Sequence, residues 1–532
     1  MKQTMKQTMK HQSLLSGIKS LGIMLSLGLA LASCTKDDVA QNPAKPNEEG
    51  NKNLTTFVAG GENKTRTSMD YDSGDFYWEA GDYIYVKDDD GVLRKSTNAP
   101  DQKVASFNYK VPGKFTDHSS YKVYYLGKNS SGNSVTISTA QLQTAPNNTA
   151  HFGTAGDYGM AKAKKVPGKN QFEFELEHHP AYLVFQPYTS NTILRNCKLT
   201  KVEVTSDNDI AETYTFNPTT DALDASAVTD GKQIILTTKS PVWGSSNYNG
   251  FPLTNNSASV TTNGAYMVIK PGTHTLKVRY WVKYVATSTE GTITKTYPST
   301  VYASNTYYDM TAQLDIKNYD GDHYYMWDAQ DQYWKGHEWW SANKDQPVWN
   351  YGSNSNYAKN NSDSRWYNEG GGSGRFDATH ASCKDLPNVN EMTWYAAYGE
   401  PRWDANELWT TMGHLYKGGM WFKKKSVLQA EGHYNSNTAF DGTDWRTANK
   451  DQRWVPSQTL PSAADADKYF YLPALGYYWN GGLSNVGVSG RYWSSSAHLF
   501  SSHAYCLYFD IGYVDVHGHG RFLGYRVDGG FE

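Results

Sequence analysis

Apolar and polar residues alternate with a period of two at many places between residues 54 and 315. Residues 172–177 read Phe-Glu-Phe-Glu-Leu-Glu, and residues 276–284 alternate in the same way. Because successive side chains of a strand point to opposite faces, each segment has one apolar and one polar face. Polar turns separate further strand candidates, which span residues 82–86, 121–126, 181–185 and 265–269. The pattern predicts a mainly β fold with two β-sandwiches, over residues 54–190 and 191–318.

The aromatic residues are distributed unevenly along the chain. The tryptophans that precede residue 320 are three of 17, namely Trp78, Trp243 and Trp281. The region 319–532 alternates Trp and Tyr with Gly, Asn and Ser, and we expect it to form a separate domain. It contains one clear helix signal, because Asn388 is a good N-cap, Glu391 follows as in a capping box, and Gly399 can end the helix.

The N-terminus has the pattern of a bacterial export signal. Several lysines precede twelve small or apolar residues, 21–32. This stretch is shorter than the ~20 residues of a membrane-spanning helix and fits a secretory signal peptide. It ends in Leu31-Ala32-Ser33-Cys34, which resembles a bacterial lipobox. The resemblance implies a signal peptide over 1–33, a diacylglycerol on Cys34 and an outer-membrane anchor. A coincidental Cys behind an ordinary signal peptide is the alternative.

The residues after Cys34 refine the predicted location. Lys36-Asp37-Asp38 resembles the surface-export signal of Bacteroidetes lipoproteins, which implies exposure on the outer face of the cell. The segment 34–53 is rich in Asn, Pro, Lys and Glu, a composition typical of a flexible tether. We therefore expect the folded domains to be held away from the membrane by a lipidated linker.

A short ordered motif follows the tether. Residues 55–59 are strand-like, Thr65-Arg66-Thr67 comes next, and Trp78-x-x-Gly-Asp precedes another strand. This order resembles the fimbrillin family of Bacteroidetes, pilus subunits and pilus-associated lipoproteins with two transthyretin-like, Ig-like β-sandwiches. The resemblance implies that a trypsin-like protease cuts after Arg66 and removes the first strand. The groove would then accept a donor strand from another pilus subunit. A surface Arg in a turn is the alternative interpretation of Arg66.

Four further motifs occur in order in the C-terminal region. They are Cys-x-x-Leu-Pro-x-x-x-Glu-Met at 383–392, Leu-Pro-Ala at 472–474, Gly-x-Tyr-Trp-Ser-Ser at 490–495 and Gly-x-Arg at 524–526. This set resembles the C-type-lectin-like modules of Bacteroidetes and Fibrobacter surface proteins, which are related in fold to formylglycine-generating enzymes. The resemblance implies an α+β C-type-lectin-like domain over 319–532. Val527 stands where many members have Cys, so Cys383 is either free or paired with Cys506.

A lectin-like domain binds its ligand through long loops, so loop tryptophans are candidate contacts for a glycan or a protein surface. Neighbouring polar side chains could hydrogen-bond sugar hydroxyls or hold Ca²⁺. The candidates are Trp334, Trp339, Trp340, Trp349, Trp366, Trp403, Asp404, Asn406, Asp444 and Trp445. The alternative is that most of these tryptophans fill a loop-rich core. Glu400-Pro401-Arg402 carries Arg where a sugar-binding calcium motif needs an amide, so a calcium-dependent site is not supported.

The motifs of common enzyme classes are absent from the sequence. The segment 337–341 lacks the second His of a His-Glu-x-x-His zinc site, and there is no Gly-x-Ser-x-Gly elbow. His517-Gly518-His519 could present two imidazoles on one strand face, but its glycines favour a solvated hairpin turn. We expect no catalytic activity, no metal ion and no cofactor beyond the lipid on Cys34. Carboxylate pairs for glycoside hydrolysis stay open, because their pairing is spatial.

The charge balance restricts the partners. The chain has 50 Lys and Arg against 53 Asp and Glu, and a nucleic-acid-binding protein needs a basic surface instead. Together the resemblances imply a tip adhesin of a fimbria, because the chain ends in a globular module rather than in a strand to donate. Its expected partners are other pilus subunits and a host or bacterial glycan or protein. The alternatives are a permanently anchored glycan-binding lipoprotein and a surface glycoside hydrolase.

Overall fold

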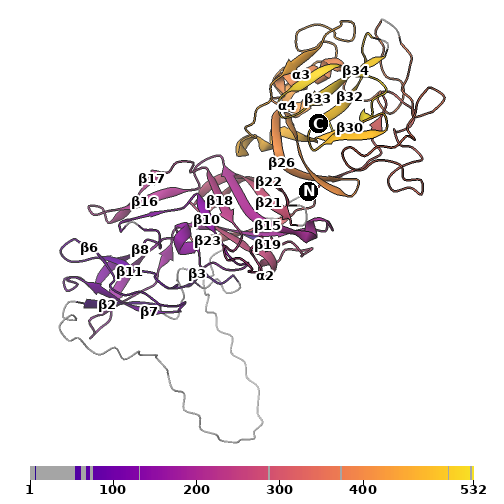
Figure 1. The fold of residues 1–532 in the computed structure, drawn as a ribbon. Coiled ribbons are helices and arrows are strands. Elements are labelled where there is room, and N and C mark those ends of the chain that lie inside the picture. The colour runs from indigo at the N-terminus through magenta and orange to yellow at the C-terminus, as the bar shows by residue number, and fades with distance from the viewer. Residues whose placement is uncertain are drawn as a thin grey trace, which may run out of the picture.

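The computed structural model describes residues 6–7, 54–60, 68–71, 76–130, 132–285, 288–371, 374–500, 502–527 and 530–532. The fold is mainly β, as the alternation predicts. Figure 1 shows an elongated body that holds the strands up to β23 (Thr306–Gln313) and a rounder C-terminal body. No helix in the described part of the chain is long and apolar enough to cross a membrane.

The first sheet forms the outer end of the elongated body. In spatial order its strands are β6 (Leu93–Lys95), β5 (Tyr85–Lys87), β8 (Ser120–Tyr125), β11 (Gly159–Lys165), β12 (Gln171–Phe174), β2 (Leu54–Ala59) and β7 (Phe107–Pro112), and β13 (Glu177–His178) pairs with β11. The sheet rolls up, because Thr97, just beyond β6, donates its N–H to the carbonyl of Lys110 in β7 at 2.7 Å. It encloses a core that includes Phe57, Trp78 and Phe172.

The second sandwich consists of a four-stranded sheet and the part of a larger sheet that faces it. The smaller sheet has the order β1 (Lys6–Gln7), β23, β14 (Ala181–Tyr188) and β20 (Ala265–Ile269). The larger one contains β10 (Ala140–Leu142), β18 (Gln233–Thr237), β15 (Cys197–Ser206), β21 (Gly272–Tyr284) and β22 (Thr289–Tyr302), with β19 (Phe251–Pro252) on β15. The sheets meet where Phe185 of β14 lies edge-on to Tyr280 of β21.

Strands from both sides of the expected boundary at residue 190 pair with each other. β14 pairs with β20 and β23, so it lies in a sheet of the second sandwich. Earlier segments also cross over, since β10 pairs with β18, and β9 (Ser134–Thr136) joins β16 (Glu212–Asn217) and β17 (Ala222–Ala227) in a small sheet. Local alternation identifies a strand but not its partner, so it does not predict these pairings.

Short elements complete the elongated body. They are β3 (Ser68–Met69), β4 (Phe76–Tyr77), the helices α1 (Phe152–Ala155) and α2 (Val260–Asn263), and a 3₁₀ turn over Leu194–Asn196. β3 and β4 pair with each other. Met69 and Phe76 join the core of the second sandwich, so the chain after β2 packs against that domain.

The C-terminal domain is built from three sheets and two helices. A six-stranded sheet has the order β25 (Tyr324–Tyr325), β35 (Tyr525–Arg526), β32 (Gly490–Ala497), β33 (His503–Phe509), β34 (Val514–Gly520) and β28 (Gln452–Trp454). β26 (Arg402–Thr411), β27 (His414–Lys423) and β29 (Tyr469–Pro473) form the second sheet with β24 (Asn318–Tyr319), and β30 (Leu475–Trp479) pairs with β31 (Gly482–Val486). A 3₁₀ helix spans Ala463–Lys468, and α4 spans Lys425–Ala430.

The predicted helix is confirmed as α3 (Val389–Tyr398). Asn388 and Glu391 form the predicted capping box, and the Gly399 N–H bonds to the carbonyls of Trp394 and Tyr395. Behind this helix lie β33 and β34. His517-Gly518-His519 lies within β34, so the expected hairpin turn is wrong. The glycine instead allows a close approach, because a Cβ at Gly518 would lie 2.6 Å from the ring of His498.

Candidate functional site

Three of the candidate tryptophans lie in the core of the C-terminal domain. Trp334, Trp403 and Trp445 are 0%, 6% and 1% exposed. The Trp445 indole N–H donates to the carboxylate of Asp441 at 3.2 Å, which ties its polar edge to the protein. These side chains have no free face on which a sugar ring could stack, so their role is to fill the loop-rich core.

The other candidate tryptophans from this region differ in exposure. Trp339 and Trp366 are partly buried, and the indole N–H of Trp366 donates to Glu369 at 2.8 Å. Trp340 and Trp349 are 51% and 60% exposed. Two of the predicted tryptophans therefore offer a large free face to a partner.

The polar candidates are held by other side chains of the domain. Asp444 forms a two-point ion pair with Arg446, at 2.7 and 2.9 Å, and accepts a hydrogen bond from Asn390 at 2.8 Å. Burial acts to raise the pKa of Asp444, but these donors outweigh it and lower the pKa to about 2. Asn406 lies 3.4 Å from the Lys417 ammonium. The carboxylate of Asp444 is thus part of the scaffold, and the structure does not bring it together with the exposed tryptophans.

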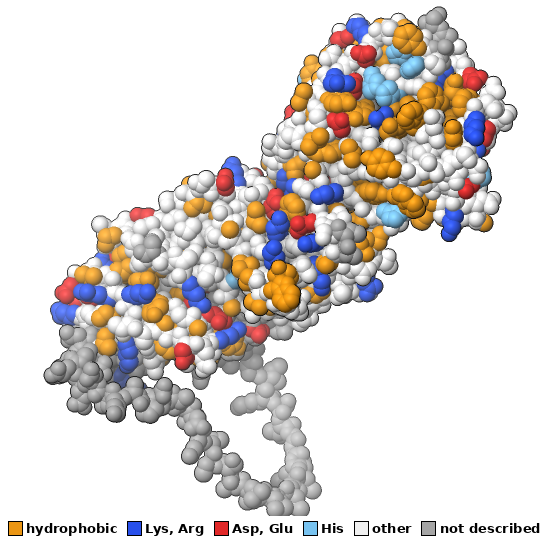
Figure 2. Space-filling view, viewed as in Figure 1, with side chains coloured by type: hydrophobic (Ala, Val, Ile, Leu, Met, Phe, Trp, Pro, Cys, Tyr) orange, Lys and Arg blue, Asp and Glu red, His pale blue; other side chains and the backbone are white. Residues whose placement is uncertain are grey.

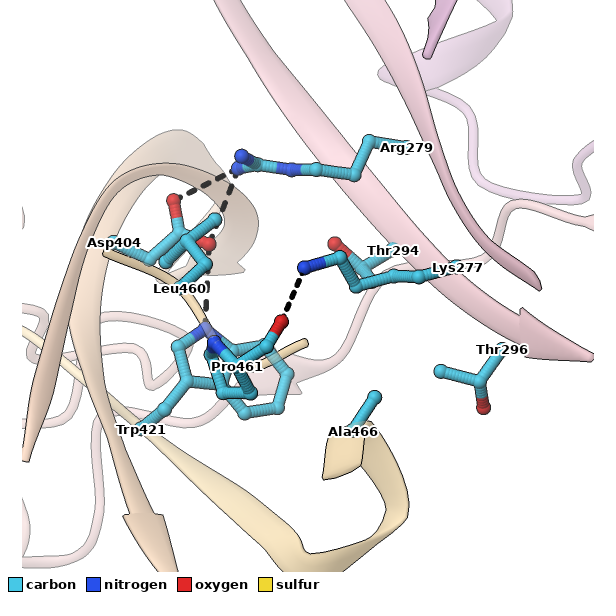
Figure 3. Close-up of a pocket in the computed structure, with 9 residues that line it drawn as sticks. All are labelled: Lys277, Arg279, Thr294, Thr296, Asp404, Trp421, Leu460, Pro461 and Ala466. Carbon is cyan, nitrogen blue, oxygen red and sulfur yellow. Dashed lines mark hydrogen bonds and ion pairs between the residues drawn. The ribbon is translucent and has the colours of Figure 1, made fainter. Parts of the chain in front are cut away.

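Asp404 lies at the junction between the second sandwich and the C-terminal domain. It is 2% exposed and accepts from Arg279 of β21 at 2.9 and 3.1 Å and from the Trp421 indole at 3.2 Å. Lys277, also of β21, donates to the carbonyl of Pro461. These groups line a cavity of about 160 Å³ in which side chains of the two domains face each other (Figure 3). Asp404 therefore joins the domains and does not face an external ligand.

Glu407 strengthens the same junction. Thr294 of β22 donates to its carboxylate through the backbone N–H at 3.0 Å and the hydroxyl at 2.7 Å. The strands also touch, because Thr292 of β22 pairs with Glu407 of β26 and so joins the sheets of the two domains. Burial, followed by the charge of Asp404, raises the pKa of Glu407 to about 7.

Exposed aromatic residues form a surface at the loop end of the C-terminal domain, which we call the aromatic rim. Its members are Trp340, Trp349, Tyr351 and Trp479, exposed by 51%, 60%, 89% and 53%. Tyr351 donates its N–H to the carbonyl of Leu483 of β31 at 2.8 Å, which places it beside the β30–β31 hairpin, whose first strand ends at Trp479. Trp340 packs on Trp339, which reaches the 413–414 turn, and Trp349 contacts His414 in the same turn.

The rim includes two residues that the sequence analysis missed. Trp479 directly precedes Asn480-Gly481, and both residues of that turn have positive φ, at 46° and 76°. An Asn-Gly pair between apolar runs is a strong hairpin signal, so it could have placed Trp479 at a hairpin tip. Tyr351 carries no comparable signal. Hydrophobic side chains gather on the visible face of this domain in Figure 2.

β2 is an internal strand of the first sheet. It pairs with β7 over six residues and with β12 over four. Phe57 is fully buried between the rings of Phe115 and Phe172, at centroid distances of 5.2 and 5.1 Å. Removal of β2 would leave two strands with unpaired backbone groups and an apolar slot between them. The predicted lipid site Cys34 and cleavage site Arg66 lie outside the described residues.

The cysteines of the described residues are free thiols. Cys197, Cys383 and Cys506 are buried and unpaired, so the possible Cys383–Cys506 disulfide is not formed. Both belong to one small apolar cluster of the C-terminal domain, where Cys383 accepts a hydrogen bond from the backbone of Asp328 at 3.3 Å.

The chain matches no protein-family profile and no curated protein. Solved structures give weak likenesses. A candidate cell adhesion protein from Bacteroides ovatus is 12% identical, with a TM-score of 0.30, over 49% of this chain and 93% of its own. A fimbrial protein from the same species is 12% identical, with a TM-score of 0.22, over 89% and 98%. The fimbrial anchor protein Mfa2 from Porphyromonas gingivalis is 14% identical, with a TM-score of 0.19, over 44% and 80%.

Proposed function

We propose that this chain is a cell-surface adhesin and the tip subunit of a fimbria. The observation that carries the proposal is the position of β2 between β7 and β12. Its alternate residues are buried, and Arg66 follows it closely in the sequence. Cleavage after Arg66 would free β2 together with the lipidated N-terminus, and a strand from a neighbouring subunit could then refill the slot. The neighbours named above are described as adhesion and fimbrial proteins, but the proposal depends on this chain's own architecture.

The packing of residues 525–527 and 530–532 supports the proposed tip position. β35 pairs with β25 and β32, and the ring of Phe531 packs against Tyr395 at 5.4 Å and Tyr492 at 6.0 Å. This segment belongs to the core of its own domain, so it is not available as a donor strand. The chain is thus proposed to accept a strand and to present its C-terminal domain at the outer end.

The aromatic rim is the proposed contact surface of the adhesin. Exposed Trp and Tyr faces stack on the C–H face of a sugar ring or pack against a protein surface. The C-terminal domain carrying the rim is proposed to be C-type-lectin-like and to act by binding, without catalysis. The lipid on Cys34 would hold the precursor at the outer membrane until Arg66 is cut.

The maturation step is tested by sequencing the N-terminus of protein shed from the surface of cells with an Arg-specific protease. We expect a start at Thr67 and copurification with a stalk pilin. Arg66→Ala should abolish both, whereas Lys64→Ala, two residues earlier, should leave them unchanged. A start at Cys34 alone in the wild type would contradict the proposal. It would favour a permanently anchored glycan-binding lipoprotein, for which the aromatic rim needs no cleavage.

The contact surface is tested by applying the full chain to glycan and host-protein arrays. We expect Trp349→Ala combined with Tyr351→Ala to weaken binding at least about tenfold, because anchor aromatics dominate such surfaces. Trp243→Ala is the matched control, since Trp243 is 84% exposed but belongs to the second sandwich. Equal loss in both variants would show that exposed tryptophan as such, and not the rim, mediates the contact.

A further inference from the structure

Three potential metal ligands converge on one face of the six-stranded sheet. Cys506 of β33 lies directly opposite His517 of β34, and His519 follows two residues later on the same face. The thiol and one nitrogen of each imidazole lie within 4.8 Å of one another. Cys506 is fully buried, while the His517 side chain is 19% exposed. The group is therefore closed to solvent on the Cys506 side and open to solvent on the His517 side.

The two imidazoles are turned so that their Nε2 atoms face each other. These atoms are in direct contact, and the ring planes are nearly perpendicular, at 85°. The opposite edge of each ring faces a polar group, although His517 Nδ1 makes no hydrogen bond within the described residues. His517 Nδ1 lies 3.3 Å from the carboxylate of Asp515, and His519 Nδ1 contacts the hydroxyl of Tyr525. A carboxylate behind the non-coordinating nitrogen is the usual way in which proteins orient a metal-binding His.

We propose that Cys506, His517 and His519 bind one transition-metal ion that prefers thiolate and imidazole, either zinc(II) or copper(I). One sulfur and two nitrogens match the ligand preferences of both ions, and neither needs the oxygen ligands that Mg²⁺ and Ca²⁺ require. Three protein ligands with one side open to solvent leave room for a fourth ligand from solvent. The site is independent of the aromatic rim and of strand exchange.

The proton balance of binding is defined. Cys506 is a free thiol, so the apoprotein holds the proton. Binding forms the sulfur–metal bond, breaks the S–H bond and releases one proton to solvent. Tyr525 can accept from His519 Nδ1–H as well as from Arg491, whose guanidinium donates to it at 2.9 Å, because its oxygen has two lone pairs. Both Nε2 lone pairs are then free for the metal.

The charges around Cys506, His517 and His519 influence whether this site prefers zinc(II) or copper(I). The Arg491 guanidinium lies over the ring of Tyr525, with its central carbon 5.5 Å from the ring centroid. Asp515 supplies a negative charge but shares it with Arg453 at 2.9 Å. A thiolate with copper(I) is neutral overall, whereas zinc(II) adds a net positive charge beside Arg491. The surroundings therefore favour the monovalent ion.

One other group in the described residues has a comparable spacing of ligand atoms, formed by Asp320, Asp322 and His323. It is less suited to such an ion, because His323 Nδ1 already lies 2.7 and 2.8 Å from the two carboxylates. The group is also about half exposed and has no sulfur. It serves as an internal comparison for the test.

The experiment titrates the full chain with zinc(II) and, anaerobically, with copper(I), and measures stoichiometry by elemental analysis. Cobalt(II) is the spectroscopic probe, because a thiolate ligand gives a sulfur-to-cobalt charge-transfer band. We expect one ion per chain and that band. Cys506→Ala and His519→Gln should each weaken binding at least about 100-fold, and Asp515→Asn by about 10-fold, since it only orients His517. Tighter binding of copper(I) than of zinc(II) is the result expected from the charges around the site.

Two matched controls keep the test decisive. A variant with Cys34, Cys197 and Cys383 all changed to Ala keeps Cys506 as its sole cysteine and should bind as the wild type does. His323→Gln should also leave binding unchanged. The proposal is overturned if the wild type binds no ion at a defined stoichiometry. It is equally overturned if binding and the charge-transfer band survive in His519→Gln, which is judged only where its circular dichroism matches the wild type.

Discussion

The elongated body and the C-terminal domain bury aromatic residues in different ways. In the sandwiches the core comes from strand residues, and burial alternates along each strand, as in β16, where every second residue from Glu212 to Phe216 is buried. In the C-terminal domain some core tryptophans, such as Trp403 and Trp409, lie in strands. Others come from loops and are positioned by hydrogen bonds, namely Trp327, Trp334 and Trp445. In the first case local sequence determines which face is buried, and in the second the path of the loops determines it.

Buried polar groups hold the loops of the C-terminal domain together. Asp328 is fully buried, has a positive φ of 52°, and accepts from His380 and Thr379 backbone N–H groups at 2.7 and 2.8 Å. Asn368 donates to the same carboxylate at 2.8 Å. One carboxylate thus fastens three loop positions that no strand connects, and the tryptophans then fill the space between the loops.

The prediction with the largest expected change in stability replaces a buried loop tryptophan of the C-terminal domain. Trp445→Ala should destabilise the C-terminal domain by about 3–5 kcal/mol, because it leaves a large cavity and removes the indole donor to Asp441. Trp340 is also a candidate loop tryptophan by sequence, but it is exposed. Trp340→Ala should change the free energy of unfolding by less than about 0.5 kcal/mol. Urea unfolding of the full chain, monitored by near-UV circular dichroism, measures both. Similar small effects in the two variants would show that the loops do not form a packed core.

This contrast also shows which structural features could be predicted from the sequence and which could not. The strands at 181–185 and 265–269 and the capped helix after Asn388 were predictable, because their signals are local. The partner of β14 was not, since pairing joins distant segments. Trp340 and Trp445 lie in similar sequence contexts. Trp445 is buried and Trp340 is exposed, because the loop that carries Trp445 folds into the core. The strand conformation at His517 was missed because Gly518 suggests a turn, whereas here it admits the ring of His498.

The prediction with the smallest expected change in stability concerns the junction between the elongated body and the C-terminal domain. In the folded protein the pKa of Glu407 is about 7, above its ordinary value of 4.5. The folded state therefore binds this proton more tightly than the unfolded state does. Its contribution to stability is complete below pH 4.5 and is lost as the pH rises to about 7. The full shift corresponds to about 3 kcal/mol, and because the Glu407 side chain is only partly buried, we expect a loss on the order of 1–2 kcal/mol.

Glu407→Gln isolates this contribution, because glutamine keeps the shape and an acceptor oxygen for Thr294 but does not titrate. Urea unfolding at pH 5 and pH 8 should show the wild type losing more stability than the variant over that range. Glu290→Gln is the control, since Glu290 lies in the same β22 strand. If the wild type and Glu407→Gln respond equally to pH, the junction does not hold a protonated carboxyl.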